Sequence, residues 1–272
     1  MKLSTRIHPR SIIGVVLLVV LLFPVYWMVN TSLQGKENLL YTTWVPLNLD
    51  LHGYQQAISS QTGNLVTSLI VAAGSVLVCL AIATPAAYGL SRTHVRLRGA
   101  NVFLVVLLIT QMVPGIVIAN GLFPLYNDTG LVNTYVGLIL ADASLGVPFC
   151  ILLMREFMRN IPVSLIEAVR LDGANEGRIF SSIVLPLSRN AIVTAAVFSF
   201  LFAWSDFLFA LTLTTNGTVT PVTLSMYQFI GSDTQSWPAL MATSTLASIP
   251  AAVLLVIAQR YIATGVTGGA VK

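Results

Sequence analysis

Charged residues are scarce in this 272-residue chain: Asp, Glu, Lys and Arg together make up 9% of it, whereas hydrophobic residues make up 56%. An ordinary soluble domain carries about 25% charged residues, so a water-soluble globular protein is excluded. The mean hydropathy of +0.83 instead indicates an integral membrane protein. The length favours a single domain over residues 1–272.

The regular alternation of polar and apolar residues that a membrane β-barrel requires is absent from the sequence. A membrane-spanning helix needs about 20 mostly apolar residues, and six stretches provide them. They lie at residues 11–30, 65–90, 102–122, 135–154, 191–213 and 243–261. The sequence therefore predicts an all-α polytopic membrane protein with six transmembrane helices and a core over about residues 65–262. The first stretch is too long for a signal-peptide core and lacks an Ala-x-Ala cleavage site, so we expect an uncleaved helix.

Positive charge is almost missing from one side of this topology. If both termini lie on one side of the membrane, only Lys36 of the fourteen Lys and Arg residues falls on the other side. Because Lys and Arg mark the cytoplasmic loops, both termini are expected to be cytoplasmic. The net charge of +4 then indicates contact with anionic membrane lipid, and no nucleic acid partner is expected.

Residue sets that carry enzyme chemistry are also lacking. The two cysteines, Cys79 and Cys150, both fall inside predicted spans, which excludes a disulfide scaffold. No His, Cys and carboxylate set has metal-ligand spacing, and no nucleophile–base pair is visible. The only Gly-Lys pair, Gly35-Lys36, is followed by Glu37 and does not form a phosphate-binding loop. We therefore expect neither ATP hydrolysis nor a bound cofactor in this chain.

A polar segment interrupts the apolar pattern at about residues 155–190. Ser164 and Glu167 have the spacing of a capping box, and Gly173 occupies a position where helices end in a left-handed residue. A second amphipathic helix is expected to stop at Pro186, because proline cannot donate the next backbone hydrogen bond. We call this predicted pair of short helices, residues 164–186, the elbow.

The composition of the elbow favours a protein partner over a lipid surface. Three carboxylates, those of Glu167, Asp172 and Glu176, lie among its arginines, and anionic lipid would repel them. An ion pair between Asp172 and Arg178 would brace the elbow across Gly173; the alternative is that both side chains are simply solvated.

The elbow resembles the signature loop of the permease subunits of bacterial ABC importers, Glu-Ala-Ala-x3-Gly-x9-Ile-x-Leu-Pro. The matching residues are Glu167, Ala168, Gly173, Ile183, Leu185 and Pro186, and Val169 departs from the pattern. The similarity runs nearly end to end and is to the carbohydrate-uptake branch, the one typified by the smaller maltose-transporter permease. Further matches lie at residues 44–46, 114, 124–126, 130–134, 157–162, 204–207 and 265–272. Within residues 204–207 the usual pattern is Trp-Asn-Glu-Phe, from which Ser205 and Asp206 depart in size while keeping the acid.

This resemblance implies a subunit of an ATP-driven, binding-protein-dependent importer of a sugar or sugar derivative in the bacterial inner membrane. The implied partners are a second permease subunit, two ATPase subunits that hold ATP and Mg, and an extracytoplasmic solute-binding protein. The elbow would couple closure of the ATPases to alternating access. The coupling residues are expected to be Glu167, Ala168, Asp172, Gly173, Ile183, Leu185 and Pro186. The resemblance also implies that a tail at residues 263–272, with Gly268 and Gly269, contacts the ATPases; the alternative is a frayed terminus.

Two carboxylates, Asp142 and Asp206, lie inside predicted spans, where each costs roughly 3 kcal/mol unless it faces a wet cavity. Asp206 beside Trp204 suits a sugar pathway, because the acid binds hydroxyl groups and the ring stacks on the sugar. The alternative is a structural acid bonded to backbone. Gln111 and Asn120 also lie within a predicted span, where they either line the pathway or flank a proline kink with locally satisfied amides.

A different class of transporter remains open at this point. In a proton-coupled secondary transporter, Asp142 and Asp206 would form the proton relay. That interpretation explains two carboxylates without a basic residue at the same membrane depth, but it leaves the elbow and the tail unexplained.

Overall fold

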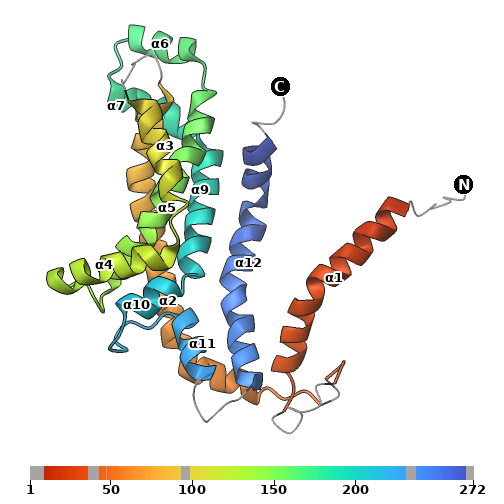
Figure 1. Cartoon of the computed structure of the whole chain (residues 1–272). Coiled ribbons are helices and arrows are strands. Elements are labelled where there is room, and N and C mark those ends of the chain that lie inside the picture. The colour runs from red at the N-terminus through yellow and green to blue at the C-terminus, as the bar shows by residue number, and fades with distance from the viewer. Residues whose placement is uncertain (1–8, 36–42, 47, 93–98, 231–236, 268–272) are drawn as a thin grey trace, which may run out of the picture. The chain divides into compact units, whose positions relative to one another are not determined.

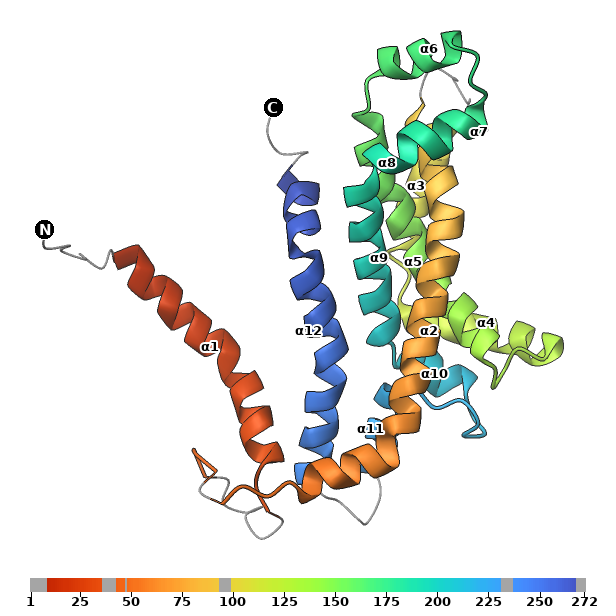
Figure 2. The same cartoon turned by 180° about the vertical axis from the view of Figure 1, so that it is seen from behind.

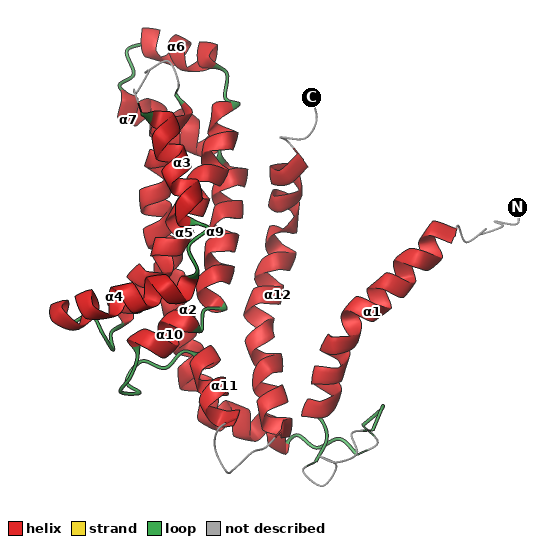
Figure 3. Ribbon diagram, viewed as in Figure 1, coloured by secondary structure: helices red, strands yellow, loops and turns green. Residues whose placement is uncertain are grey.

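The computed structural model describes residues 9–35, 43–46, 48–92, 99–230 and 237–267, and every regular element in these ranges is a helix (Figures 1 and 3). The all-α prediction is therefore confirmed for the described part of the chain. The helices are α1 (Pro9–Ser32), α2 (His52–Ser91), α3 (Ala100–Thr110), α4 (Gly115–Thr129), α5 (Tyr135–Arg159), α6 (Val163–Leu171), α7 (Glu176–Ile179), the π-helix η2 (Phe180–Val184), α8 (Leu185–Leu187), α9 (Arg189–Trp204), α10 (Leu208–Leu213), α11 (Val222–Ile230) and α12 (Trp237–Thr267).

The chain divides into two compact units. The first comprises residues 1–63 and 226–249, and the second comprises residues 64–225 and 250–272. Helices α2, α11 and α12 each contribute residues to both units, so the two units are joined by continuous helices. The expectation of one domain over the whole chain stays a prediction.

In the first unit, polar side chains hold the segment that follows α1. The amides of Asn30 and Gln34 donate hydrogen bonds to the carbonyl oxygen of Thr43 over 2.7 and 2.9 Å. The Asp50 carboxylate accepts a hydrogen bond of 2.8 Å from the backbone N–H of His52 and so caps the first turn of α2. This cap explains why α2 begins at residue 52, well before the apolar stretch predicted from residue 65.

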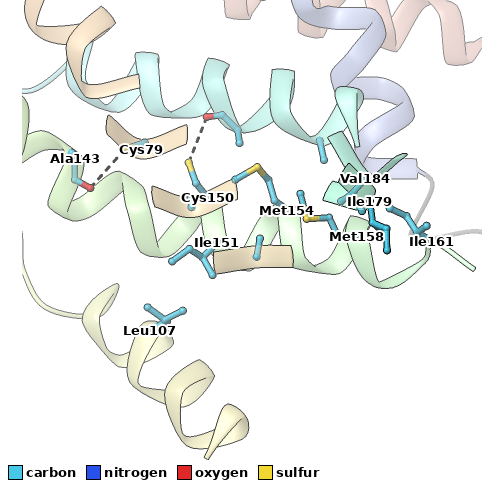
Figure 4. Packing of buried hydrophobic residues seen from close by; sticks show 14 of the residues in the cluster. Cys79, Leu107, Ala143, Cys150, Ile151, Met154, Met158, Ile161, Ile179 and Val184 are labelled. Atoms are coloured by element: carbon cyan, nitrogen blue, oxygen red, sulfur yellow. Dashed lines mark hydrogen bonds between the residues drawn. The ribbon is translucent and has the colours of Figure 1, made fainter. Parts of the chain in front are cut away.

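In the second unit, α5 is the central helix: it packs along α9 and also contacts α3, α4 and α10 (Figure 2). Small side chains allow the helices to approach closely, as is usual between membrane helices. Cys150 lies 3.6 Å from the carbonyl oxygen of Ala195 on α9, and Cys79 of α2 lies 3.7 Å from that of Ala143 on α5 (Figure 4). Both cysteines are free and buried, so they serve as small apolar side chains in this packing.

The stretch at residues 102–122 is not one helix as predicted. It is divided into α3 and α4, which meet at an angle of 97° (Figure 1). Pro114 stands in extended conformation at the start of α4, with φ −59° and ψ 134°. A proline disfavours the helical conformation of the residue before it, so α3 ends ahead of Pro114 and the polypeptide changes direction there.

The stretch at residues 191–213 is also interrupted. Helix α9 ends at Trp204, and α10 begins only at Leu208. The carboxylate of Asp206 accepts hydrogen bonds from the backbone N–H groups of Phe209 and Ala210, over 3.3 and 3.1 Å. Asp206 therefore satisfies amides at the beginning of α10 that have no partner within the helix.

Four described helices are long and apolar enough to cross a membrane: α1, α2, α5 and α12. The count rises to six if each sharply bent pair is taken as one span. One pair is α3 with α4, and the other joins residues 176–187 to α9 at 75°. A membrane protein is confirmed, whereas the number of six spans stays a prediction.

Gly146 provides a test of the close packing in the second unit. A methyl group at this position of α5 would lie 2.7 Å from the sulfur of Cys79 and 3.3 Å from the hydroxyl of Ser199. We expect Gly146→Ala to lower the free energy of unfolding by about 1–3 kcal/mol through overpacking, measured as a lower Tm in detergent.

Two further variants give this experiment its controls. Gly89→Ala, where nothing lies within 4 Å of the added methyl group, is expected not to lower the Tm. Cys79→Ala removes the closest atom and should recover part of the loss caused by Gly146→Ala. Additive effects of the two substitutions would contradict a direct contact.

Candidate functional site

The elbow begins with α6, which follows directly after Pro162. Pro162 has no side-chain acceptor and caps nothing, while Ser164 lies inside the first turn. The predicted capping box of Ser164 and Glu167 is therefore wrong. The physical reason lies in Pro162. Proline disfavours a helical conformation of the residue before it, and its own φ suits a helix start, so the helix begins at Val163.

The C-terminal end of α6 agrees with the sequence prediction. Gly173 has φ +85°, a backbone conformation that residues other than glycine adopt only at a cost in free energy. Its N–H bonds to the carbonyl oxygen of Arg170 over 3.0 Å, and the N–H of Ala174 bonds to that of Val169 over 3.2 Å. This pair of bonds is the Schellman arrangement, which reverses the direction of the chain within the elbow.

The second half of the elbow continues further than predicted. The Asn175 side chain caps α7 by accepting a 2.9 Å bond from the N–H of Arg178. The wider turn of η2 then precedes Pro186, which lies inside the short helix α8. The prediction that Pro186 ends this helix is wrong, because a proline needs room near the carbonyl groups one turn back and the preceding π-turn alters that spacing.

An ion pair braces the two halves of the elbow, but between other residues than expected. Arg170 of α6 pairs with Glu176 of α7, and the Tyr88 hydroxyl donates a 3.3 Å hydrogen bond to the other carboxylate oxygen of Glu176. Among the ion pairs of the described residues, none joins Asp172 to Arg178, and both residues are exposed, as in the alternative of two solvated side chains. The left-handed turn at Gly173 explains the pairing of Arg170 with Glu176, since it brings the start of α7 back toward α6.

One side of the elbow is embedded in the second unit. Ile166, Ile179 and Val184 are buried in the same cluster as Met154 and Met158 of α5. Figure 4 shows Ile179 and Val184 gathered beside these two methionines. Burial of each large apolar side chain contributes about 1.5–3 kcal/mol, so the base of the elbow is firmly attached to the helices that span the membrane.

The opposite side of the elbow projects into solvent. Glu167, Ala168 and Asp172 are exposed, and Leu171 is 89% exposed. The Glu167 carboxylate forms no hydrogen bond or ion pair with another described residue. The structure thus brings the predicted residues of α6 together on one accessible surface, formed by Glu167, Ala168, Leu171 and Asp172, which we call the elbow surface.

Leu171 was missed by the sequence prediction. It follows Ile166 by five positions, which places the two side chains on different faces of one helix. Ile166 and Leu171 can therefore not both be buried against the same neighbouring helices. This spacing could have indicated from the sequence that one of the two side chains is exposed. The remaining motif residues, Ile183 and Leu185, are half-buried, and Pro186 is exposed.

The predicted pathway residues are distributed differently. Asp142 of α5 is buried at 6% exposure. Trp204 is only 8% exposed and stacks on Phe200, with ring centroids 5.4 Å apart. The indole face therefore packs inside this chain, and the carboxylate of Asp206 bonds to backbone amides, as in the alternative of a structural acid.

Gln111 and Asn120 were predicted to line the pathway. Among the described residues, neither side-chain amide forms a hydrogen bond with Asp142 or Asp206. Gln111, at the end of α3, donates a 3.1 Å hydrogen bond to the carbonyl oxygen of Leu145. Asn120 is exposed on α4. Gly268 and Gly269 of the predicted tail contact lie outside the described residues. In the part of the chain that the structure describes, no group of three His, Cys, Asp or Glu side chains could hold a metal ion.

Comparison with known proteins agrees with this geometry. The family model described as binding-protein-dependent transport system inner membrane component matches residues 80–268. The sulfoquinovosyl glycerol transport system permease protein SmoH of Agrobacterium fabrum is 32% identical, over 97% of this chain and 93% of its own. The trehalose/maltose transport system permease protein MalG of Thermococcus litoralis is 30% identical, over 96% of this chain and 95% of its own.

A similar fold occurs in the solved structure of a bacterial ABC transporter involved in the import of the acidic polysaccharide alginate. The TM-score is 0.79 at 21% identity, and the match covers 96% of this chain and 98% of that one. Because the family model covers most of the chain and the two relatives match over nearly their whole length, the chain belongs to the binding-protein-dependent transport system inner membrane components, the permease subunits of ABC importers.

Proposed function

We propose that this chain is one of two permease subunits in an ATP-driven importer of a sugar or sugar derivative. Two ATPase subunits would bind ATP and Mg beneath it, and an extracytoplasmic solute-binding protein would deliver the substrate. Both termini and the elbow would lie in the cytoplasm of a bacterial cell. The family and the distribution of basic residues support this arrangement.

The observation that carries the proposal is the two-sided construction of the elbow. Its elbow surface is accessible, while its other side is anchored by Ile166, Ile179 and Val184. A segment that merely connected two spans would need neither an exposed leucine nor a buried base. A partner that contacts the elbow surface could therefore move the attached helices without unfolding the segment.

The chemistry expected of this coupling is a shift between two states rather than a reaction in this chain. Closure of the ATPases around ATP would displace α6, and the buried contact of Ile166 with the cluster around Met158 would carry that displacement to α5. The other end of the elbow leads through α8 into α9. Contacts that differ between the inward-open and outward-open states would then change their populations.

The substrate class rests on the relatives. SmoH is named for sulfoquinovosyl glycerol and MalG for trehalose and maltose; the former is a sugar derivative and the latter two are sugars. Their similarity over nearly the whole chain supports a carbohydrate-type substrate here. Asp206, Asp142, Trp204, Asn120 and Gln111 are retained as candidates for the pathway, where a second permease would complete the lining.

Glu167→Ala tests the coupling role of the elbow surface. We expect the amount of chain in the membrane to stay unchanged, because the Glu167 side chain is exposed and forms no hydrogen bond or ion pair with other described residues. Uptake driven by ATP should fall about 10–100-fold, which corresponds to the loss of one charged hydrogen bond of about 1.5–3 kcal/mol to a partner. The measurement is uptake by vesicles that contain the complete transporter and ATP.

Asp128→Ala is the matched control, since it removes an exposed carboxylate from α4, away from the elbow. It should leave the coupling of uptake to ATP hydrolysis intact. Normal uptake in Glu167→Ala would remove this residue from the coupling site. Uptake abolished by a protonophore at constant ATP would instead favour the proton-coupled transporter.

Leu171→Asp tests whether the elbow surface is a protein contact. Because Leu171 is 89% exposed, the substitution should not change the Tm of the isolated chain. In the complex a leucine side chain that becomes buried contributes about 1.5–3 kcal/mol. We therefore expect the ATPase subunits to be lost during gentle purification from the native membrane.

The control for this experiment is Leu49→Asp, which changes a 70% exposed leucine outside the elbow. It should leave the ATPases bound. Retention of the ATPases by Leu171→Asp, or a lone chain purified from the unmodified strain, would contradict the proposal.

Asp206 can be tested for a pathway role separately from its role as a helix cap. The amides of Phe209 and Ala210 bond to different oxygens of the carboxylate, so asparagine keeps an acceptor for one of them, whereas alanine removes both and should cost about 1 kcal/mol of stability. We expect Asp206→Asn to lower the Tm less than Asp206→Ala does, and to raise the substrate concentration for half-maximal uptake about tenfold, the effect of losing one charged hydrogen bond. Unchanged uptake in Asp206→Asn would leave only the cap.

A further inference from the structure

An apolar groove lies in the second unit between α2, α9 and the C-terminal part of α12, with a volume of about 420 Å³. Every lining side chain is a hydrocarbon except that of Tyr261, and none of the lining residues is acidic. The walls include Val76 and Leu77 from α2, Ala196 and Phe200 from α9, and Leu254 from α12. All three helices belong to candidate membrane spans, so the groove is at membrane depth.

Two arginines meet at the end of the groove where Tyr261 lies. The guanidinium carbon of Arg260 lies 4.8 Å from the centroid of the Tyr261 ring, and Arg260 donates a 2.9 Å hydrogen bond to the tyrosine hydroxyl. The guanidinium carbon of Arg189 lies 5.8 Å from the same centroid. Both arginines are exposed. One aromatic ring thus brings together two positive charges at the end of a hydrocarbon groove.

This end of the groove coincides with the expected level of the lipid headgroups. Tyr261 lies in the C-terminal part of α12, which runs to Thr267, and Arg189 is the first residue of α9, directly after α8. Tyrosine and arginine at the end of a span are typical of the membrane interface, where the ring is partly buried and the charge is hydrated. The acyl and headgroup regions of a lipid would therefore meet matching surfaces at matching depths.

We propose that this groove binds an anionic glycerophospholipid, with an acyl chain between α2, α9 and α12 and the phosphate group at Arg189 and Arg260. Charge complementarity selects the anionic lipid, because a zwitterionic headgroup offers the two guanidinium groups no net negative charge. Basic sites between transmembrane helices on the cytoplasmic side are typical of such lipids. The inference requires only that the chain spans a membrane and is independent of the imported substrate.

The test compares lipid binding by the full-length chain and its variants. The purified protein is titrated with vesicles of phosphatidylglycerol or phosphatidylcholine that have identical acyl chains, and bound lipid is counted by native mass spectrometry. We expect phosphatidylglycerol to stay bound and to raise the Tm more than phosphatidylcholine does. Arg189→Gln and Arg260→Gln should each weaken its binding about fivefold, the effect of one basic residue near a membrane surface.

Two further variants separate the groove from general surface charge. Arg159→Gln removes an exposed arginine at the end of α5 and should leave lipid binding unchanged. Ala196→Phe fills the groove without altering charge and should displace the lipid although both arginines remain. Equal binding of the two lipids, or equal loss in Arg159→Gln and Arg260→Gln, would overturn the proposal. So would a photo-crosslinker at position 196 that captures a protein rather than lipid in the native membrane.

Discussion

The position of the elbow depends on the burial of Ile166, Ile179 and Val184 beside Met154 and Met158. This contact joins a polar segment to helices that are otherwise surrounded by hydrocarbon. Without it, the segment between α5 and α9 would be a solvated connection whose position is independent of the bundle. With it, the exposed side of α6 has a defined orientation, and force applied there acts directly on α5.

The break between α9 and α10 occurs where side chains form hydrogen bonds with backbone groups that lack a partner within a helix. At the end of α9, the Asp206 carboxylate bonds to two amides of α10, and the Thr223 hydroxyl bonds to the carbonyl oxygen of Asp206 over 2.5 Å. Unbonded backbone groups are very costly in a bilayer, and irregular backbone is found only where protein or water satisfies it. The acid that suggested a sugar contact from its sequence position thus has a structural task as well.

The class of the protein, most of its helices and the surface of α6 could be predicted from composition, apolar runs and one motif. The errors arose where a local rule competed with its surroundings. Ser164 has the spacing of a capping residue, but Pro162 starts the helix earlier. Pro186 should end a helix, yet the preceding π-turn accommodates it. The pairing of Arg170 with Glu176 depends on the chain reversal at Gly173, and no periodic pattern in the sequence reveals that distance.

The exposure of Leu171 also bears on how cells must produce this protein. In the proposed importer, an ATPase subunit would cover this leucine, of which 89% is in water in the isolated chain. Copies made in excess of the partner would keep the side chain exposed beside the carboxylates of Glu167 and Asp172. Co-expression with the partner subunits should therefore give better yields than expression of this chain alone.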